Sequence, residues 1–271
     1  MVMNVFLPAL TFNVLSQAPI TWDLAAISVV SLLTAAASLT LALAVYGWIW
    51  RRRVEKPTLG ALLLASTFAN ATYLGLPVVT AVVGAEFARV AVIFDLLGMS
   101  ILLFTVGTMI CVETGTTGTR HSAVEGLMQV IKLPPFSAAV IGILVNASGV
   151  PLPEFLRDAT ETAGRVVAPA MLFSIGLALG IPRLARLPIL APALVIKLVV
   201  APFIGWLLIS WLIHDPATAQ ATLLEAGMPT MVLTMVFAER YGLDEDMLAQ
   251  AILFSTILAM ATLPTLAYYL R

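Results

Sequence analysis

Long apolar runs alternate with short polar stretches along this chain. About 20 apolar residues cross the hydrocarbon core of a membrane as a helix. Nine segments approach or exceed that length: Met1–Gln17, Leu24–Trp50, Leu59–Gly84, Ala88–Val112, Leu127–Ser148, Gly164–Gly180, Pro188–Ile213, Ala217–Ala238 and Met247–Leu270. Because these runs are continuous, they predict membrane helices; the strands of a membrane barrel would alternate between apolar and polar residues.

Two of the predicted helices hold helix-breaking residues near their middle. The uncharged run Pro57–Ala85 contains Gly75 and Pro77, and the eighth segment contains Gly227 and Pro229. Proline deletes a backbone hydrogen bond, and glycine tolerates non-helical dihedral angles. In lipid an unpaired backbone group costs several kcal/mol, so such breaks are tolerated only inside protein or beside an aqueous cavity. The pattern predicts a binding site at the two breaks; a simple kink is the alternative.

Composition agrees with a membrane protein. The chain is 61% hydrophobic and 11% charged, with a mean hydropathy of +1.02; soluble domains are about 45–50% apolar and about 25% charged. The chain has no basic tract of the kind that would indicate a nucleic-acid partner. A single cysteine, Cys111, excludes an internal disulfide, and His121 and His214 are far apart in sequence. We therefore expect no metal site and no cofactor.

Lysine and arginine are unequally divided between the loops on the two sides of the membrane. One side collects Arg51, Arg52, Arg53, Lys56, Arg120, Lys132, Arg183, Arg186 and Arg240. The other collects Arg89, Arg157, Arg165 and Arg271. Cytoplasmic loops carry the excess of these residues, so the first set is predicted to face the cytoplasm. We expect a multi-pass protein of the cytoplasmic (inner) membrane, with its C-terminus outside and no signal peptide.

The two halves of the chain share short similar stretches. "LPALTF" at Leu7–Phe12 is similar to "APAMLF" at Ala168–Phe173, and "LGLPVV" at Leu74–Val79 is similar to "AGMPTM" at Ala226–Met231. Chance recurrence in apolar sequence is the alternative to duplication. A complete unit would have five helices, an odd number, so two tandem units would enter the membrane from opposite sides as inverted repeats. The first unit is expected to lack its first helix.

Three charged residues are predicted inside the membrane, where each costs at least about 2.5–3.5 kcal/mol at the bilayer centre. Glu225 lies two residues from Gly227 and is the candidate ion-coupling residue, for H⁺ or Na⁺. Lys197 and Asp95 are candidate charge partners. A permanent structural ion pair is the alternative for these two.

Five stretches occur in an order typical of a known family. The longest are "FANATYLGLPVVTAVVG" and "EAGMPTMVLTMVFAERYGLDEDMLAQAILFSTILAMATLP"; the others are "FLPALTF", "GVPLP" and "APAMLFSIGLALG". They resemble the auxin efflux carrier family in its bacterial form. Members of this family include plant auxin carriers and bacterial permeases for malate, malonate and similar anions.

The resemblance implies ten helices in two inverted repeats, with a fold like that of the bile acid:sodium symporters. The fourth and ninth helices would be broken and would cross at Pro77 and Pro229. One domain would move against the other like an elevator, and the scaffold would form a homodimer. The implied parts are a scaffold of residues 1–17 and 127–180, a transport (crossover) domain of 24–112 and 188–270, and a cytoplasmic linker of 113–126.

The predicted substrate site combines residues at both breaks: Asn70, Thr72, Tyr73, Gly75, Pro77, Gly227, Met228, Pro229 and Thr230. Asn70 and Thr72 would supply side-chain hydrogen-bond donors. Glu225 would couple transport to an ion. "EAGMP" is similar to the "EVGMQ" stretch of the bile acid:sodium symporters, where the glutamate binds sodium, although a proline follows Met228 here.

These features predict a secondary transporter, or permease, for a small organic anion such as a carboxylate, proton-coupled or acting as a uniporter. The alternatives are a sodium-coupled symporter and an inactive truncated carrier. No Gly-x-Ser-x-Gly or His-Glu-x-x-His pattern is present, and we expect no enzymatic activity.

Overall fold

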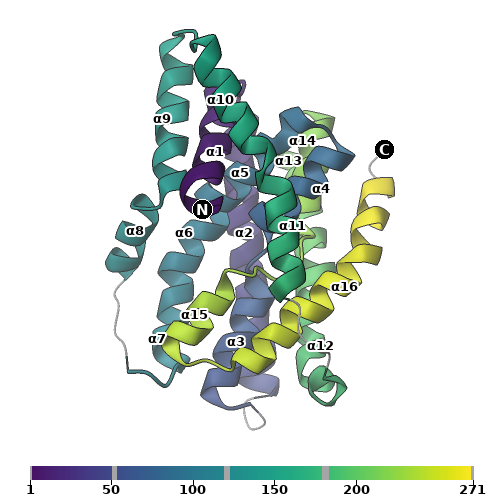
Figure 1. Ribbon diagram of the computed structural model, residues 1–271. Helices are drawn as coiled ribbons and strands as arrows, with labels where there is room; N and C mark the ends of the chain where they lie inside the picture. The colour runs from purple at the N-terminus through teal and green to yellow at the C-terminus, as the bar shows by residue number, and fades with distance from the viewer. Residues whose placement is uncertain (1, 51–53, 119–122, 179–182, 270–271) are drawn as a thin grey trace.

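The computed structural model describes residues 2–50, 54–118, 123–178 and 183–269, and every regular element in these ranges is a helix (Figure 1). The predicted all-α class is thereby confirmed for the described part of the chain. Several residues used above to predict the orientation or to argue against a metal site lie outside these ranges: Arg51, Arg52, Arg53, Arg120, His121 and Arg271.

The first part of the chain contains seven α-helices and several tighter or wider helical turns. In order these are η1 (Val2–Phe6), α1 (Leu7–Ser16), α2 (Trp22–Ala44), η2 (Val45–Ile49), α3 (Lys56–Thr67), η3 (Ala71–Gly75), α4 (Leu76–Val82), η4 (Ala85–Phe87), α5 (Ala88–Phe94), η5 (Asp95–Met99), α6 (Ser100–Leu102), η6 (Leu103–Gly107) and α7 (Thr108–Thr114). Of the turns, η4 is 3₁₀-helical and the others are π-helical.

The second part contains nine α-helices. They and their connecting turns are α8 (Ala123–Ile131), α9 (Pro134–Ser148), α10 (Glu154–Arg165), α11 (Val167–Ala178), η7 (Leu184–Arg186), α12 (Leu187–Val195), η8 (Ile196–Val200), α13 (Ala201–Leu212), α14 (Pro216–Ala226), α15 (Thr234–Tyr241) and α16 (Glu245–Tyr269).

By length and composition, four helical stretches in the described residues are suited to cross a membrane: Trp22–Ile49, Ala85–Thr114, Leu184–Leu212 and Glu245–Tyr268. Shorter apolar helices cover Asn4–Ser16, Ala71–Val82 and Pro134–Ser148. The chain is therefore a multi-pass membrane protein. The predicted spans 59–84 and 217–238 each consist of two shorter helices with a non-helical stretch between them.

Two expected boundaries are corrected by the structure. The predicted span Leu127–Ser148 is divided between α8 and α9, because Pro134 and Pro135 begin a new helix and Leu133 before them is extended. A residue before proline avoids the helical region, which explains this break. The expected linker 113–126 is partly helical, since α7 extends to Thr114 and α8 begins at Ala123.

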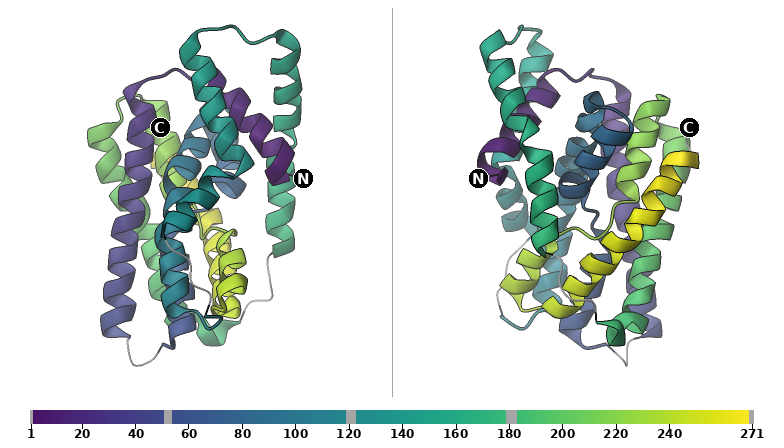
Figure 2. Two further views of the ribbon diagram at one scale, coloured as in Figure 1. Left: turned by 90° about the vertical axis from the view of Figure 1, so that its left-hand side faces the viewer. Right: turned by 45° about the vertical axis from the view of Figure 1, so that its right-hand side comes forward.

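The helices that begin the chain pack against those in its middle. α1 contacts both α9 and α10, and these three helices stand together at one side of the molecule (Figure 2). α11 continues from α10 and packs on η3 and α4, which belong to the predicted transport domain. The predicted scaffold and transport domains thus meet along α11. Their division and relative movement remain predictions.

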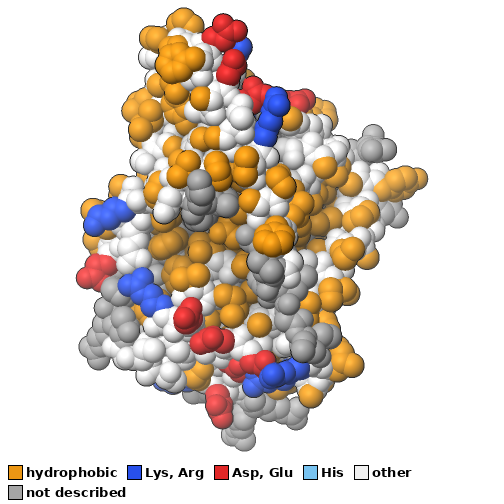
Figure 3. Space-filling model, in the orientation of Figure 1, with side chains coloured by type: hydrophobic (Ala, Val, Ile, Leu, Met, Phe, Trp, Pro, Cys, Tyr) orange, Lys and Arg blue, Asp and Glu red, His pale blue; other side chains and the backbone are white. Residues whose placement is uncertain are grey.

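The surface has the character expected of a protein in lipid. On the face in Figure 3, charged side chains gather over α10, over α8 and near α15 and the start of α16, and hydrophobic side chains cover much of the remaining surface. α2 and its extension η2 carry Trp22, 64% exposed, near one end and Trp48, 84% exposed, near the other. Tryptophan at both ends of a span is typical of the two membrane–water interfaces.

The side chain of Tyr46 is hydrogen-bonded to the backbone of α12. The Tyr46 hydroxyl donates a hydrogen bond to the Ile189 carbonyl (3.0 Å) and accepts one from the Ala193 amide (2.8 Å). These two backbone groups are four residues apart and would bond each other in a regular α-helix, so the hydroxyl is inserted into α12 beside Pro192. α12 runs directly into η8, the turn that carries Lys197.

A half-buried carboxylate joins three elements at the end where α3 and α16 begin. Asp244 accepts hydrogen bonds from Thr58 (2.7 Å), from Arg186 (2.8 and 2.9 Å) and from the Met247 amide (3.0 Å). Its own amide donates to the Pro57 carbonyl (3.2 Å). Burial alone would raise the pKa of Asp244, but these hydrogen bonds outweigh it and hold the pKa below its usual range.

We predict that Asp244→Asn lowers the free energy of unfolding by about 1–3 kcal/mol, because charged hydrogen bonds to a partly buried group are lost. The folded-state pKa is lowered, so this stabilisation is fully present above the unfolded pKa of about 3.9 and is lost as the pH falls through the lower folded value. Thermal unfolding in detergent should show a constant gap to wild type above about pH 5, narrowing below pH 4.

Asp158→Asn is the matched control, because that carboxylate is 63% exposed and lies at the outer limit of an ion pair, 4.0 Å from Arg157. Equal thermal midpoints for Asp244→Asn and Asp158→Asn at pH 7 would contradict a role of Asp244 in joining the three elements.

Candidate functional site

The two interrupted helices pair with each other through their backbones. α3 ends at Thr67 and α14 ends at Ala226. The Asn70 amide donates to the Pro229 carbonyl (2.8 Å), and the Met231 amide donates to the Phe68 carbonyl (2.9 Å). We call the paired segments, residues 68–70 and 229–231, the crossing; they form an antiparallel bridge. Backbone groups left free by the breaks thus satisfy one another.

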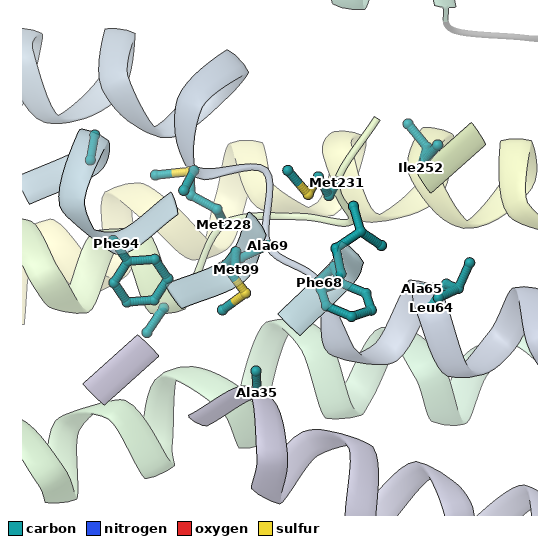
Figure 4. Packing of buried hydrophobic residues seen from close by; sticks show 14 of the residues in the cluster. Ala35, Leu64, Ala65, Phe68, Ala69, Phe94, Met99, Met228, Met231 and Ile252 are labelled. Carbon is teal, nitrogen blue, oxygen red and sulfur yellow. The ribbon is translucent and has the colours of Figure 1, made fainter. Parts of the chain in front are cut away.

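The crossing lies at the middle of the molecule. α3 and α15 extend from it toward one end, and α4 and α14 extend toward the other (Figure 1). Apolar side chains close around it, with Phe68, Met99, Met228 and Met231 in one cluster (Figure 4). Two helix C-termini and two helix N-termini therefore meet in an apolar surrounding, where their partial charges are weakly screened.

The first break was predicted at the wrong residues. Gly75 and Pro77 lie within the continuous helix Ala71–Val82, and the extended residues are 68–70. Pro77 is tolerated in this helix because it lies at the start of α4 directly after the π-helical turn η3, whose wider hydrogen-bond pattern accommodates a residue without an amide hydrogen. Pro229 lies in the non-helical stretch between α14 and α15, as predicted.

Gly75 has a different role: its lack of a side chain leaves room for the carboxylate of Glu225. A Cβ atom at this position would overlap both carboxylate oxygens of Glu225. The backbone of Gly75 is ordinary right-handed helix, with φ of −62°. The glycine is therefore required by close packing between the two interrupted helices, and its conformational freedom is not used.

Three charged residues from three different helices form one buried cluster. Glu225, Lys197 and Asp95 are 0%, 1% and 4% exposed, and Glu225 interacts electrostatically with both of the others. The Lys197 ammonium donates to the Ala226 carbonyl (3.2 Å). Within the described residues, neither carboxylate oxygen of Glu225 accepts a hydrogen bond. The predicted charge partners are thus brought together, with Glu225 the least satisfied member.

Asp95 is linked to the first interrupted helix. Its carboxylate accepts a hydrogen bond from the Thr72 hydroxyl and another from the Ser100 hydroxyl (2.9 Å). The hydrogen of the Thr72 hydroxyl is thus directed to Asp95, and the role of Thr72 as a hydrogen-bond donor to the substrate stays a prediction. Ser100 was missed by sequence reasoning; its only signal was a hydroxyl five residues after an intramembrane carboxylate.

π-Helical turns carry most of these polar residues. Thr72 and Gly75 lie in η3, Asp95 in η5 and Lys197 in η8. A π turn adds a residue to the helix and leaves a backbone carbonyl for other partners, and such turns are frequent at functional sites. At η5, the Ser31 hydroxyl on α2 donates to the Phe94 carbonyl (2.8 Å).

A small cavity adjoins this cluster. Its polar side is formed by Asn70, Thr72, Tyr73, Asp95 and Ser100. Its volume of about 30 Å³ corresponds to roughly one water molecule.

The opposite wall comes from elsewhere in the chain. Leu7 on α1, Leu133 and Pro135 are contributed by the predicted scaffold, and Met231 and Leu233 by the second interrupted helix. The cavity thus lies between the two predicted domains. None of these five apolar residues was singled out from the sequence, because nothing in their local pattern distinguishes them from lipid-facing residues.

The remaining predicted residues hold the crossing in place. The Thr230 hydroxyl donates to the Ala65 carbonyl (2.9 Å), and its amide donates to the Ser255 hydroxyl oxygen (3.1 Å). Gly227 packs closely on Leu266 of α16, and Met228 is buried in the apolar cluster. Gly227, Met228, Pro229 and Thr230 are absent from the cavity wall.

Comparisons with known proteins find relatives over most of the chain. A family model with the description "Membrane transport protein" matches residues 1–267. An "Uncharacterized transporter" of Methanothermobacter thermautotrophicus is 28% identical, covering 97% of this chain and 85% of that protein. A "Putative malonate transporter" of Rhizobium meliloti is 27% identical, covering 98% and 83%. A further "Uncharacterized transporter", from Methanocaldococcus jannaschii, is 25% identical, covering 78% and 68%.

We predict that Gly75→Ala destabilises the protein by about 1–3 kcal/mol, because overpacking a tightly packed site forces neighbours to shift. Thermal unfolding in detergent measures this loss. In the background of Glu225→Ala the loss caused by Gly75→Ala should be smaller, since the obstructing carboxylate is gone. Gly47→Ala is the control: Gly47 has nothing within 4 Å of an added Cβ. Equal melting temperatures for the two single variants would contradict the close contact.

Proposed function

The chain belongs to the membrane transport protein family, which includes the auxin efflux carriers, and we propose that it is a secondary transporter of a small organic anion. One relative carries malonate in its name, and malonate is a dicarboxylate. This supports a carboxylate as the substrate class. The other two relatives reported above are named only as transporters.

The observation that carries the substrate class is an unused hydrogen-bond donor. The Asn70 side-chain nitrogen is buried, has no partner within the described residues, and belongs to a residue of the cavity wall. Buried donors are rarely left unpaired, and exceptions are frequent at functional sites. A carboxylate oxygen is the natural acceptor, since charge-assisted hydrogen bonds are roughly twice as strong as neutral ones.

The charges around the cavity support proton coupling. Two carboxyl groups, Asp95 and Glu225, accompany one ammonium group, Lys197, so the cluster carries −1 when all three are ionised. An anion approaching such a cluster is repelled. A proton on Glu225, whose oxygens accept no hydrogen bond, would neutralise the cluster and permit binding. We therefore propose Glu225 as the proton carrier; a uniporter would keep it permanently protonated.

The position of the cavity supports alternating access by relative movement of the two predicted domains. Residues of both domains form its walls, and its volume of about 30 Å³ is too small for a carboxylate substrate. The walls of the cavity must therefore separate before a substrate can enter. Sliding of the transport domain against α1, α9, α10 and α11 would open the site to one side and then to the other, as in an elevator. A scaffold homodimer would hold the fixed part steady.

A sodium-coupled symporter is the second candidate, and one observation favours it. The free carboxylate oxygens of Glu225 are hard oxygen ligands of the kind that alkali and alkaline-earth cations prefer. Replacement of Na⁺ by K⁺ during uptake separates the two candidates, because only a sodium symporter loses its driving force.

The experiment that tests the proposed function is uptake by purified protein in liposomes, with malonate, malate and succinate as radiolabelled probes. Uptake of at least one of them, stimulated by an inward proton gradient, is the expected result. Absence of uptake for these acids and for a wider carboxylate panel, from correctly folded protein, would contradict it.

We predict that Asn70→Ala lowers the affinity for the transported acid by about tenfold or more, because a hydrogen bond to a charged group contributes about 1.5–3 kcal/mol. Asn70→Asp should weaken binding further, since it replaces the donor by a negative charge. Thermal shift and concentration-dependent uptake measure both. Thr265→Ala, which removes an exposed hydroxyl on α16, is the control. Unchanged affinity in both Asn70 variants would exclude contact between this amide and the substrate.

Glu225→Gln should leave folding largely intact and abolish the response of uptake to the proton gradient, because glutamine is nearly isosteric but cannot titrate. Uptake against an imposed pH difference is the measurement. Glu154→Gln, an exposed carboxylate on α10, is the control. A Glu225→Gln transporter with the wild-type response to pH and sodium would refute the coupling role.

A further inference from the structure

We infer that Lys197 takes the place of a bound monovalent cation: its ammonium group binds the Ala226 carbonyl, next to Glu225 at the end of α14, and so makes the protein independent of dissolved sodium or potassium. The inference rests on the proposed function, because it specifies how the same buried cluster obtains its positive charge. Lysine remains attached through every cycle, whereas a dissolved ion would be bound and released each time.

The Ala226 carbonyl is available for a cation because its usual partner is used elsewhere. In a continuing helix it would accept from the amide of Thr230, four residues later. That amide donates instead to Ser255 (3.1 Å), and α14 ends at Ala226. The carbonyl therefore lies at the negative end of the α14 dipole, which favours a positive charge. The Lys197 ammonium takes this position at 3.2 Å.

Glu225 supplies a negative charge that acts on this ammonium group. Its carboxylate lies against the bare backbone of Gly75 and accepts no hydrogen bond within the described residues. A buried carboxylate without compensation costs several kcal/mol. The electrostatic attraction of Lys197 provides that compensation, and Lys197 is the cationic group that acts on Glu225 within the described part of the chain.

Lys197 is held in this position by its own helix. It lies in η8 between α12 and α13, its side chain is 1% exposed, and the Tyr46 hydroxyl fixes α12 just before it. The ammonium reaches the end of α14 from a neighbouring helix pair. A small cation binding the Ala226 carbonyl would have to displace the ammonium group, so the lysine and a dissolved ion are mutually exclusive at this position.

The test replaces the lysine by a small side chain and then adds a cation back. Lys197→Ala protein is purified in N-methylglucamine chloride and compared with wild type after addition of NaCl, KCl or methylammonium chloride. Wild-type thermal stability and uptake should be the same in all four salts, within about twofold. Lys197→Ala should lose at least tenfold in uptake in N-methylglucamine, and Na⁺ or methylammonium should restore several-fold and raise the melting temperature.

Lys56→Ala is the matched control, because Lys56 is an exposed lysine at the start of α3. It should resemble wild type in every salt. The inference is overturned when wild type itself requires sodium, when Lys197→Ala is fully active in N-methylglucamine, or when no small cation changes its stability or uptake. A lysine with a merely structural role would show no dependence on an added cation.

A second pair of variants keeps the test decisive when Lys197→Ala does not fold. Lys197→Met should unfold at lower temperature than wild type, and Lys197→Met/Glu225→Gln should regain stability because both charges are removed together. A Lys197→Met protein as stable as wild type, or no recovery in the double variant, overturns the inference. Thermal shift needs no substrate, so cation-dependent stability in Lys197→Ala without any anion uptake would reject the proposed function alone.

Discussion

A backbone amide or carbonyl in the hydrocarbon of a membrane must find a partner, and the architecture of this protein depends on how two broken helices meet that requirement. Each break is tolerable because the other one lies against it. Asn70 and Met231 donate across the crossing, and the Pro229 and Phe68 carbonyls accept. This mutual dependence places four helix ends at the centre of the molecule, where the proposed site has its polar groups.

Much of this arrangement could be predicted from the pattern of the chain. Uninterrupted apolar runs predict the helices, and Gly227–Pro229 correctly marks the second break. Gly75–Pro77 misplaced the first break by several residues, because a proline in an early helical turn is compatible with a helix and a glycine can be required by packing alone. The π turns that carry Asp95 and Lys197 had no sequence signature, since they depend on partners such as Ser31 on a different helix.

The cluster of Glu225, Lys197 and Asp95 shows why local reasoning also has limits. Burying each of these charges costs free energy, and the other charges of the cluster offset part of that cost. Because the three residues are far apart in sequence, their local patterns do not show that they are close in space. Ser100 and Met231 lie beside the same cluster without any distinguishing local pattern. Real sequences depart from local rules mainly at functional sites, and this cluster is such a departure.

The narrowness of the cavity between the two predicted domains has a consequence for energy conservation in the cell. In the proposed transporter, closure of this cavity to the size of about one water molecule, with Leu7, Leu133 and Met231 in its wall, would interrupt the path of water between the two predicted domains. Protons and small ions would then be unable to leak through the site between turnovers. A carrier of this shape can rest in the bilayer without dissipating the gradients on which other transporters depend.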